Sequence, residues 1–174
     1  MRRKPKLYIA YGSNLNLPQM ERRCPTAEVV GRRELKDYEL LFRGGSLGAV
    51  ATVEPKEGSS VPVLLWKIQP RDEEALDRYE GYPNLYKKQM IEVELGKEKV
   101  SAMVYVMAPG YQFGVPSDYY ADVIWQGYES AGFDTQILED AINHAYELSL
   151  QENWRSDGYI QQSLSGMDGW SGLK

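Results

Sequence analysis

The loop Tyr11-Gly12-Ser13-Asn14 is the first segment whose residue types could do chemistry. It ends a stretch, Lys6 to Tyr11, that is rich in β-branched and aromatic residues typical of a strand, and Pro18 fits the first turn of a following helix. Glycine permits conformations that other residues rarely adopt, and successive N–H groups in such a turn form an anion-binding concavity. We expect this loop to present backbone N–H groups, with the short side chains of Ser13 and Asn14, to a ligand. The same residues also form ordinary turns for local reasons, so the loop alone keeps both interpretations open.

A second candidate is Glu80, a carboxylate at the unfavourable end of a short helix. The helix is expected from about Pro70 to Glu80, with proline near its first position, acids in its first turn and Gly81 just past its end. A carboxylate in the last turn meets the negative end of the helix dipole, at a cost of about 0.3 to 1 kcal/mol. Burial among neighbours such as Tyr79 and Tyr82 would raise the pKa of this carboxyl toward that of a general base. The alternative is a surface glutamate whose placement is tolerated.

Length, charge and cysteine content exclude several classes of protein. A chain of 174 residues suits one domain that buries about 70% of its unfolded surface, so it needs no disulfide or metal to fold. Cys24 is the only cysteine, which excludes an internal disulfide and a cysteine-based zinc site. The net charge of −5 opposes binding to the phosphate backbone of nucleic acid. We expect no nucleic-acid partner.

The hydropathy pattern argues against export or membrane insertion. Residues 1–6 are basic, but the apolar stretch after them stops at Gly12 and is too short for the core of a signal peptide. No run approaches the ~20 apolar residues of a membrane span. We therefore expect a cytoplasmic protein with no membrane partner.

The remaining elements alternate short strands with a few helices. Strands are expected over 28–33, 38–43, 49–53, 61–68, 86–95 and 100–107, the last two forming an antiparallel hairpin, and helices over 117–131 and 135–150. This pattern predicts one mixed α/β or α+β domain, residues 1–150, whose sheet closes into a small barrel. Residues 151–174 are Gly/Ser-rich and are expected to form a C-terminal tail, with Trp154 and Trp170 as candidate anchors.

A rival motif is Gly44-Gly45-Ser46-Leu47-Gly48, which matches the G-x-S-x-G nucleophile elbow of serine hydrolases, with His144 downstream. The elbow must lead from a strand into a helix, whereas residues 49–53 are expected to form a strand. The chain is also too short for the full hydrolase sheet. A hydrolase that uses Ser46 is therefore the less favoured interpretation, and His144 is expected to be an ordinary residue on a helix face.

Two short motifs, taken together with their spacing, resemble the γ-glutamylcyclotransferase-like (AIG2-like) superfamily. A strand ends in Tyr11-Gly12-Ser13-Asn14-Leu15, the short helix ends in Leu76-Asp77-x-x-Glu80-Gly81, and Tyr86 follows Gly81 by five residues. The later strand Tyr105-Val106-Met107 fits the same pattern, so the resemblance runs from about residue 7 to residue 148. Neither motif is specific alone, but their order and spacing together are fairly specific.

The resemblance implies a fold, a reaction and a set of site residues. Such proteins fold as a small mixed β-barrel with surrounding helices and convert a γ-glutamyl amide into 5-oxoproline and a free amine. Glu80 would be the catalytic acid and base. The implied substrate-binding residues are Tyr11, Gly12, Ser13, Asn14, Leu15, Tyr86 and Tyr105. Because the substrate's own α-amine attacks its γ-carbonyl, no metal, cofactor or protein nucleophile is needed, and holding a reactive conformer is worth up to roughly 7 to 11 kcal/mol.

Several alternatives stay open at this point. The leaving amine could belong to an amino acid or peptide, as in glutathione metabolism, to the ε-amine of lysine, or to a natural product. The loop N–H groups would bind either the developing oxyanion or the α-carboxylate. The alternative function is a catalytically silent binding module of the same fold, although the presence of Glu80 favours an enzyme. A homodimer is left open as an assembly.

Overall fold

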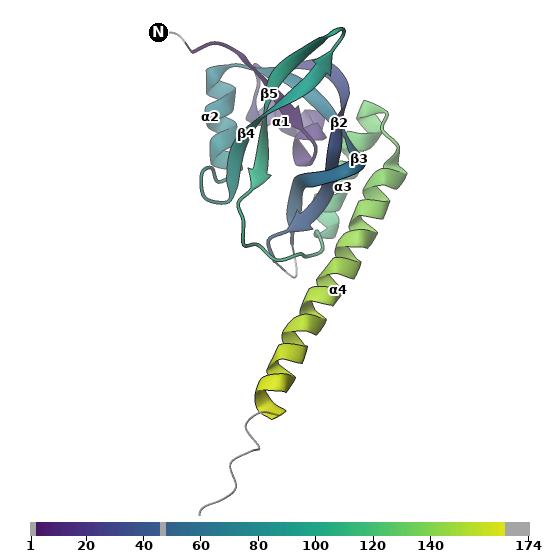
Figure 1. The fold of residues 1–174 in the computed structure, drawn as a ribbon. Coiled ribbons are helices and arrows are strands. Elements are labelled where there is room, and N and C mark those ends of the chain that lie inside the picture. The colour runs from purple at the N-terminus through teal and green to yellow at the C-terminus, as the bar shows by residue number, and fades with distance from the viewer. Residues whose placement is uncertain (1–2, 46–47, 166–174) are drawn as a thin grey trace, which may run out of the picture.

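The computed structural model describes residues 3–45 and 48–165, with side chains to residue 155 (Figure 1). The elements in chain order are β1 (Lys6–Ala10), the 3-10 turn η1 (Ser13–Leu15), α1 (Leu17–Arg23), β2 (Glu28–Arg43), β3 (Val50–Ile68), α2 (Pro70–Tyr79), β4 (Tyr86–Leu95), β5 (Glu98–Met107), α3 (Asp118–Ala131) and α4 (Thr135–Ser165). Helix α2 lies on the side of β4, and α4 runs along β2 and past the end of the sheet (Figure 1).

The five strands form one mixed sheet in the order β2-β3-β1-β5-β4. The short strand β1 is central, antiparallel to β3 and parallel to β5, and its residues Tyr8, Ile9 and Ala10 are buried. A central strand is covered on both faces, which explains why it is a continuous apolar run. The end of β1 therefore delivers the loop at 11–14 to the middle of the fold.

The sheet is curled but open, with β2 and β4 at its edges. These edges approach each other where Arg33 of β2 donates from Nε to the backbone oxygen of Glu94 in β4, at 2.9 Å. Within the described residues no strand ladder joins them, so the sheet is barrel-like without the full closure of a barrel. The predicted α+β class is confirmed.

Two pairs of predicted strands are each one long strand in the structure. Segments 28–33 and 38–43 join as β2, and segments 49–53 and 61–68 join as β3. The two long strands pair with each other, with irregularities at Val29/Gly31 and Lys36/Tyr38. The sequence 34–37 looks like a turn because it is polar. In the structure most of this segment is exposed at the edge of the sheet, and a bulge with Asp37 at φ 62° absorbs the irregular backbone. The polar composition reflects exposure rather than a break in pairing.

Helix α4 extends well beyond the predicted end at residue 150. It continues to Ser165, so residues 151–165 are helical. Trp154 is 82% exposed, so the predicted anchoring through this side chain is wrong, and Trp170 lies outside the described residues. Serine and glycine lower helix propensity by no more than about 1 kcal/mol each, which explains how the helix passes through this composition.

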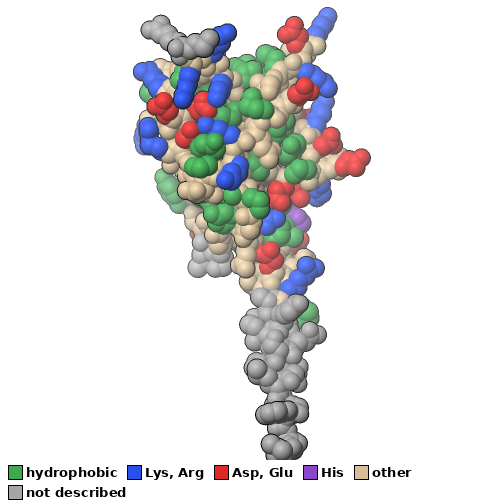
Figure 2. Space-filling model, turned by 60° about the vertical axis from the view of Figure 1, so that its left-hand side comes forward, with side chains coloured by type: hydrophobic (Ala, Val, Ile, Leu, Met, Phe, Trp, Pro, Cys, Tyr) green, Lys and Arg blue, Asp and Glu red, His purple; other side chains and the backbone are tan. Residues whose placement is uncertain are grey.

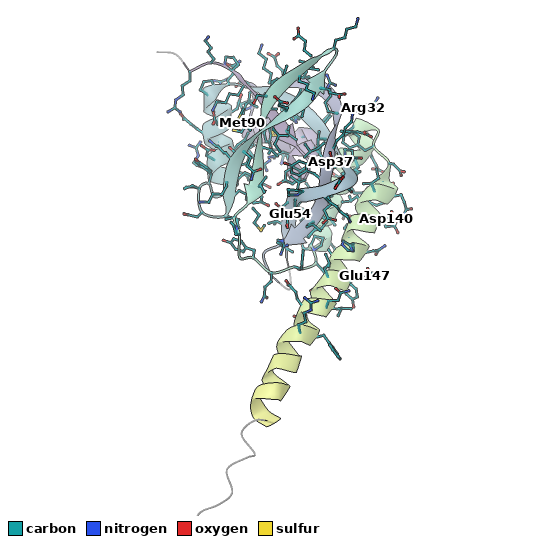
Figure 3. The ribbon with its side chains drawn as sticks, viewed as in Figure 1. Arg32, Asp37, Glu54, Met90, Asp140 and Glu147 are labelled. Atoms are coloured by element: carbon teal, nitrogen blue, oxygen red, sulfur yellow. The ribbon has the colours of Figure 1, made fainter. Side chains whose placement is uncertain are left out.

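The charged surface is mixed in sign. On the face shown in Figure 2, Lys and Arg side chains are interspersed with Asp and Glu rather than gathered by sign. Asp140 and Glu147 lie on the outer side of α4 (Figure 3), whereas Leu138 and Ala145 of the same helix are buried against the body. Among the described residues, no helix has a stretch apolar enough and long enough to cross a membrane.

Helix α3 clamps the turn that follows β1. Asn16 caps α1 by accepting from the Gln19 amide at 3.2 Å, and its Nδ2 donates to the Val123 backbone oxygen of α3 at 3.1 Å. Beside it, Gly127 of α3 lies directly against the fully buried Leu15, and a Cβ at position 127 would come 2.6 Å from the Leu15 Cβ. These contacts fix the position of the turn relative to α3.

Gly127→Ala tests this packing. Alanine favours a helix over glycine, but here its methyl group would overlap Leu15, so we expect a loss of about 1 to 3 kcal/mol in unfolding free energy. Urea denaturation measures it, with Glu129→Ala on the exposed side of α3 as the control. A stabilised Gly127→Ala variant would contradict the contact.

Candidate active site

A small pocket brings together residues from six separate parts of the chain. Its lining is Tyr8, Tyr11, Gly12, Ser13, Asn14, Ala51, Glu80, Tyr86, Tyr105 and Tyr120. These come from β1 and η1, from β3, from the end of α2, from the starts of β4 and α3, and from β5. All the predicted site residues except Leu15 are among them. Leu15 is fully buried in the core, where it packs on Gly127.

Glu80 lies immediately after α2, as its C-terminal cap, and its backbone N–H donates to the Leu76 oxygen at 2.8 Å. Its side chain is largely out of water, and Asn14 donates from Nδ2 to Glu80 Oε1 at 3.2 Å. Burial raises the pKa of this carboxyl to about 7, although the charge of Arg23 acts in the opposite direction. The predicted general-base character of the carboxylate therefore agrees with its surroundings.

Arg23, at the end of α1, orients the asparagine that contacts Glu80. Its Nη1 donates to Asn14 Oδ1, and its guanidinium stacks on the Tyr79 ring with Cζ 3.4 Å from the ring centroid. Because an arginine can only donate, Oδ1 must face Arg23 and Nδ2 must face Glu80. No local pattern in the sequence pointed to Arg23, since the two partners that place it beside the pocket, Asn14 and Tyr79, come from η1 and α2.

In the loop at 11–14, glycine suits position 12 because Ala51 lies close to the backbone there. Gly12 has φ −123°, outside the left-handed region, but a Cβ there would lie 3.3 Å from the Ala51 Cβ. The first donating amide of η1 is that of Leu15, which bonds to the Gly12 oxygen at 3.0 Å. The amides of Ser13 and Asn14 precede it and lie outside the turn's own hydrogen bonds. This agrees with the predicted presentation of N–H groups to a ligand.

Tyrosine hydroxyls make up most of the polar wall. Tyr11 donates to the Tyr105 backbone oxygen at 2.6 Å, and the hydroxyls of Ser13 and Tyr79 are 2.9 Å apart. Tyr8 and Tyr120 also line the pocket and were missed by sequence reasoning. Tyr8 looked like ordinary strand packing and Tyr120 like part of a helix start, and neither carries a local signal of function.

Other candidates lie away from this pocket. His144 of α4 is 3.8 Å from Glu147 of its own helix, and the residue Ser46 of the rival motif falls outside the described residues. The chain after that motif enters strand β3 rather than a helix, which does not fit a hydrolase elbow. Burial raises the pKa of Cys24 to about 12, so this thiol stays protonated. Across 3–45 and 48–165, no group of His, Cys, Asp and Glu side chains could hold a metal ion.

This combination of fold and pocket agrees with comparisons to known proteins. The chain belongs to the family described as gamma-glutamyl cyclotransferase, AIG2-like, whose sequence model matches residues 8–125. It is 31% identical over 146 residues to human gamma-glutamylcyclotransferase, covering 76% of this chain and 75% of the relative. The mouse protein of the same name is 30% identical over 143 residues, with the same coverage.

Solved structures show the same fold. A structure described as gamma-glutamyl cyclotransferase superimposes with a TM-score of 0.71 and 25% identity, covering 79% of this chain and 86% of that chain. YkqA from Bacillus subtilis superimposes with a TM-score of 0.69 over 84% of this chain and 56% of that chain, at 21% identity, which shows the fold alone. The predicted superfamily is confirmed.

The raised pKa of Glu80 makes stability depend on pH in a way that Glu80→Gln should reveal. Because the folded value, about 7, exceeds the ordinary 4.5, the wild type loses stability as pH rises between these values. The neutral glutamine escapes this loss, so we expect the variant to gain roughly 3 kcal/mol over wild type between pH 4 and pH 8. Urea denaturation of both proteins at both pH values measures the difference, and a constant difference would contradict the buried carboxyl.

Arg23→Met tests the opposing charge. Loss of the guanidinium should raise the pKa of Glu80 further, because the nearby positive charge favours the ionised carboxylate. The measurement is NMR titration of the Glu80 carboxyl carbon, with Arg22→Met as the control for loss of a neighbouring exposed arginine. An unchanged or lower pKa in the Arg23 variant would show that the charge does not act on Glu80.

Proposed function

We propose that the protein is an active γ-glutamylcyclotransferase, which converts a γ-glutamyl amide into 5-oxoproline and a free amine, with Glu80 as the acid and base. The observation that carries the proposal is a single carboxyl with a pKa of about 7, in a pocket otherwise walled by hydroxyl and amide groups. A general acid and base works best when its pKa lies near the working pH. The curated relatives named for this activity support the same conclusion.

The reaction needs only one proton-transferring group. Glu80 takes a proton from the α-ammonium of the substrate, and the freed amine nitrogen attacks the γ-carbonyl carbon to form a new C–N bond. The tetrahedral intermediate collapses as the old C–N bond breaks, and Glu80 returns its proton to the departing nitrogen. The ring nitrogen loses its second proton to the released amine, which leaves as an ammonium ion. The carboxylate is thereby restored after each turnover. Bringing the two ends of one substrate together supplies the rest of the rate enhancement.

The loop would hold the oxygen atoms of the substrate. The amides of Ser13 and Asn14 would donate to either the γ-carbonyl oxygen or the α-carboxylate, and donors of this kind stabilise a developing negative charge. Gly12 allows Ala51 to close the pocket from β3. Tyr11, Tyr86 and Tyr105 would form the wall around the glutamyl chain. We also propose a cytoplasmic location, which the single free cysteine supports.

The identity of the leaving amine depends on the rim of the pocket. The segment 108–111 lines a different depression with Arg43 and Glu54, so it does not shape the side of the pocket next to Glu80. Tyr79 instead connects the pocket, through Ser13, to an outer depression that also contains Gln19, Arg22, Arg23 and Tyr119. The leaving amine would extend in this direction.

Release of 5-oxoproline from a panel of γ-glutamyl amides tests the proposal. We expect Glu80→Gln to fold normally and to lower kcat/KM by about 10² to 10⁴, the usual contribution of general acid and base catalysis. In the wild type, kcat/KM should rise with pH through about 7, because the first step needs the ionised carboxylate. Ser46→Ala is the control and should keep its activity. Full activity of Glu80→Gln would overturn the mechanism, and ligand binding without turnover would favour the silent module.

A further inference from the structure

The tyrosine hydroxyls of the pocket differ in whether the protein already accepts their proton or already donates to their oxygen. A phenolic hydroxyl has one proton to donate and lone pairs to accept with. A partner that can only accept uses the proton, and a partner that can only donate uses a lone pair. The printed sequence cannot reveal this difference, but the partners in the structure do.

Three hydroxyls of the pocket have given their proton to the protein. Tyr11 donates to the Tyr105 backbone oxygen at 2.6 Å. Tyr86 donates to the Ala51 backbone oxygen at 2.5 Å, and Tyr105 donates to Asp77 Oδ1 at 2.6 Å. Both oxygens of Asp77 act as acceptors, because Lys88, which can only donate, contacts Oδ1 at 2.7 Å and Oδ2 at 2.9 Å. Tyr86 and Tyr105 therefore offer the pocket only oxygen lone pairs.

Two other hydroxyls keep their proton. The Ala51 N–H donates to the Tyr120 hydroxyl at 3.1 Å, so the same residue that accepts from Tyr86 donates to Tyr120. Asn14 donates from Nδ2 to the Tyr8 hydroxyl at 2.9 Å, an orientation set by Arg23 on the other side of the amide. Tyr8 and Tyr120 can therefore still donate to a ligand.

We propose that the pocket is polarised, with Tyr86 and Tyr105 accepting from the α-ammonium of the substrate, and Tyr8 and Tyr120 donating to its α-carboxylate. The proposal rests on the γ-glutamyl substrate proposed above. An ammonium group has three N–H donors, and Glu80, Tyr86 and Tyr105 provide one acceptor each from the same pocket. This places the amine beside the carboxylate that must deprotonate it.

The electrostatics of the two accepting phenols agree with this arrangement. Burial raises the pKa of Tyr86 and of Tyr105 far above the usual value, and the charge of Glu80 adds to the effect in both. Both phenols therefore stay protonated through turnover and bind the amine without taking its proton. Among the described residues that line the pocket, Glu80 is the one carboxylate that can take this proton. Asp77 does not contact the substrate in this scheme and acts as a positioning residue, because it directs the Tyr105 proton away from the pocket.

Two half-substrates separate the two ends of the pocket. N-glutaryl-L-alanine lacks the α-amine but keeps the carboxylate, and N-(4-aminobutyryl)-L-alanine keeps the amine but lacks the carboxylate. Their inhibition constants are measured as competitors of γ-glutamyl-L-alanine turnover in wild type, Tyr105→Phe and Tyr120→Phe. Tyr146→Phe, an exposed tyrosine of α4, is the matched control. Calorimetric dissociation constants replace inhibition constants for any variant without turnover.

Each variant should affect one probe only. We expect Tyr105→Phe to weaken the amine probe about tenfold and Tyr120→Phe to weaken the carboxylate probe about tenfold, as for loss of one hydrogen bond to a charged group. Tyr146→Phe should change neither constant. Equal weakening of both probes by each variant, which general damage to the fold would also produce, overturns the polarity, and so does the reversed pattern. Absence of 5-oxoproline from the wild type would instead overturn the proposed function and, with it, this inference.

Discussion

The hydrogen bond from Asn14 to Glu80 joins two segments that are 66 residues apart, and the site depends on it. Asn14 lies in the turn that follows the central strand of the sheet, and Glu80 caps the end of α2. Both elements must therefore be in place before the contact exists. The donor to the buried carboxyl in this contact is a neutral amide rather than a charged group. The carboxyl is thus held in position while its proton remains exchangeable.

The contrast with the other acids of α2 shows why Glu80 is chemically distinct. Burial alone would raise the pKa of Glu73, but hydrogen bonds from Lys88 and Lys6 lower it below its usual value. Asp77 is also paired with Lys88. Glu80 meets its nearest positive charge only through Asn14, because Arg23 bonds to the far side of that amide. Glu73 and Asp77 of this short helix are therefore held in ion pairs, whereas Glu80, just past its end, accepts from a neutral amide.

In the pocket wall, one small residue orients two of the tyrosines. Ala51, a small residue of β3, contributes a backbone oxygen to Tyr86 and a backbone N–H to Tyr120. Its side chain would lie only 3.3 Å from a Cβ at position 12. A polar pocket made of neutral hydroxyls can contact a zwitterionic substrate at both ends without introducing further charges that would compete with Glu80. The ion pair of Asp77 and Lys88 lies behind the wall, where Asp77 orients the hydroxyl of Tyr105.

Much of this protein could be read from local sequence signals. The helix, predicted from about 70 to 80 and found over 70–79, the hairpin at 86–107 and the loop after the first strand were predicted, because helix ends, turns and alternation depend on neighbouring residues. The catalytic role of Glu80 stays a prediction. The long strands β2 and β3 and the extension of α4 were not, since polar segments look like breaks until their exposure is known. Strand order, the roles of Arg23, Tyr8 and Tyr120, and the direction of each hydroxyl were decided only by the tertiary structure. Each of these depends on a partner brought close by the sheet, as Ala51 is to Tyr120 across 69 residues, and a linear pattern contains no record of such a partner.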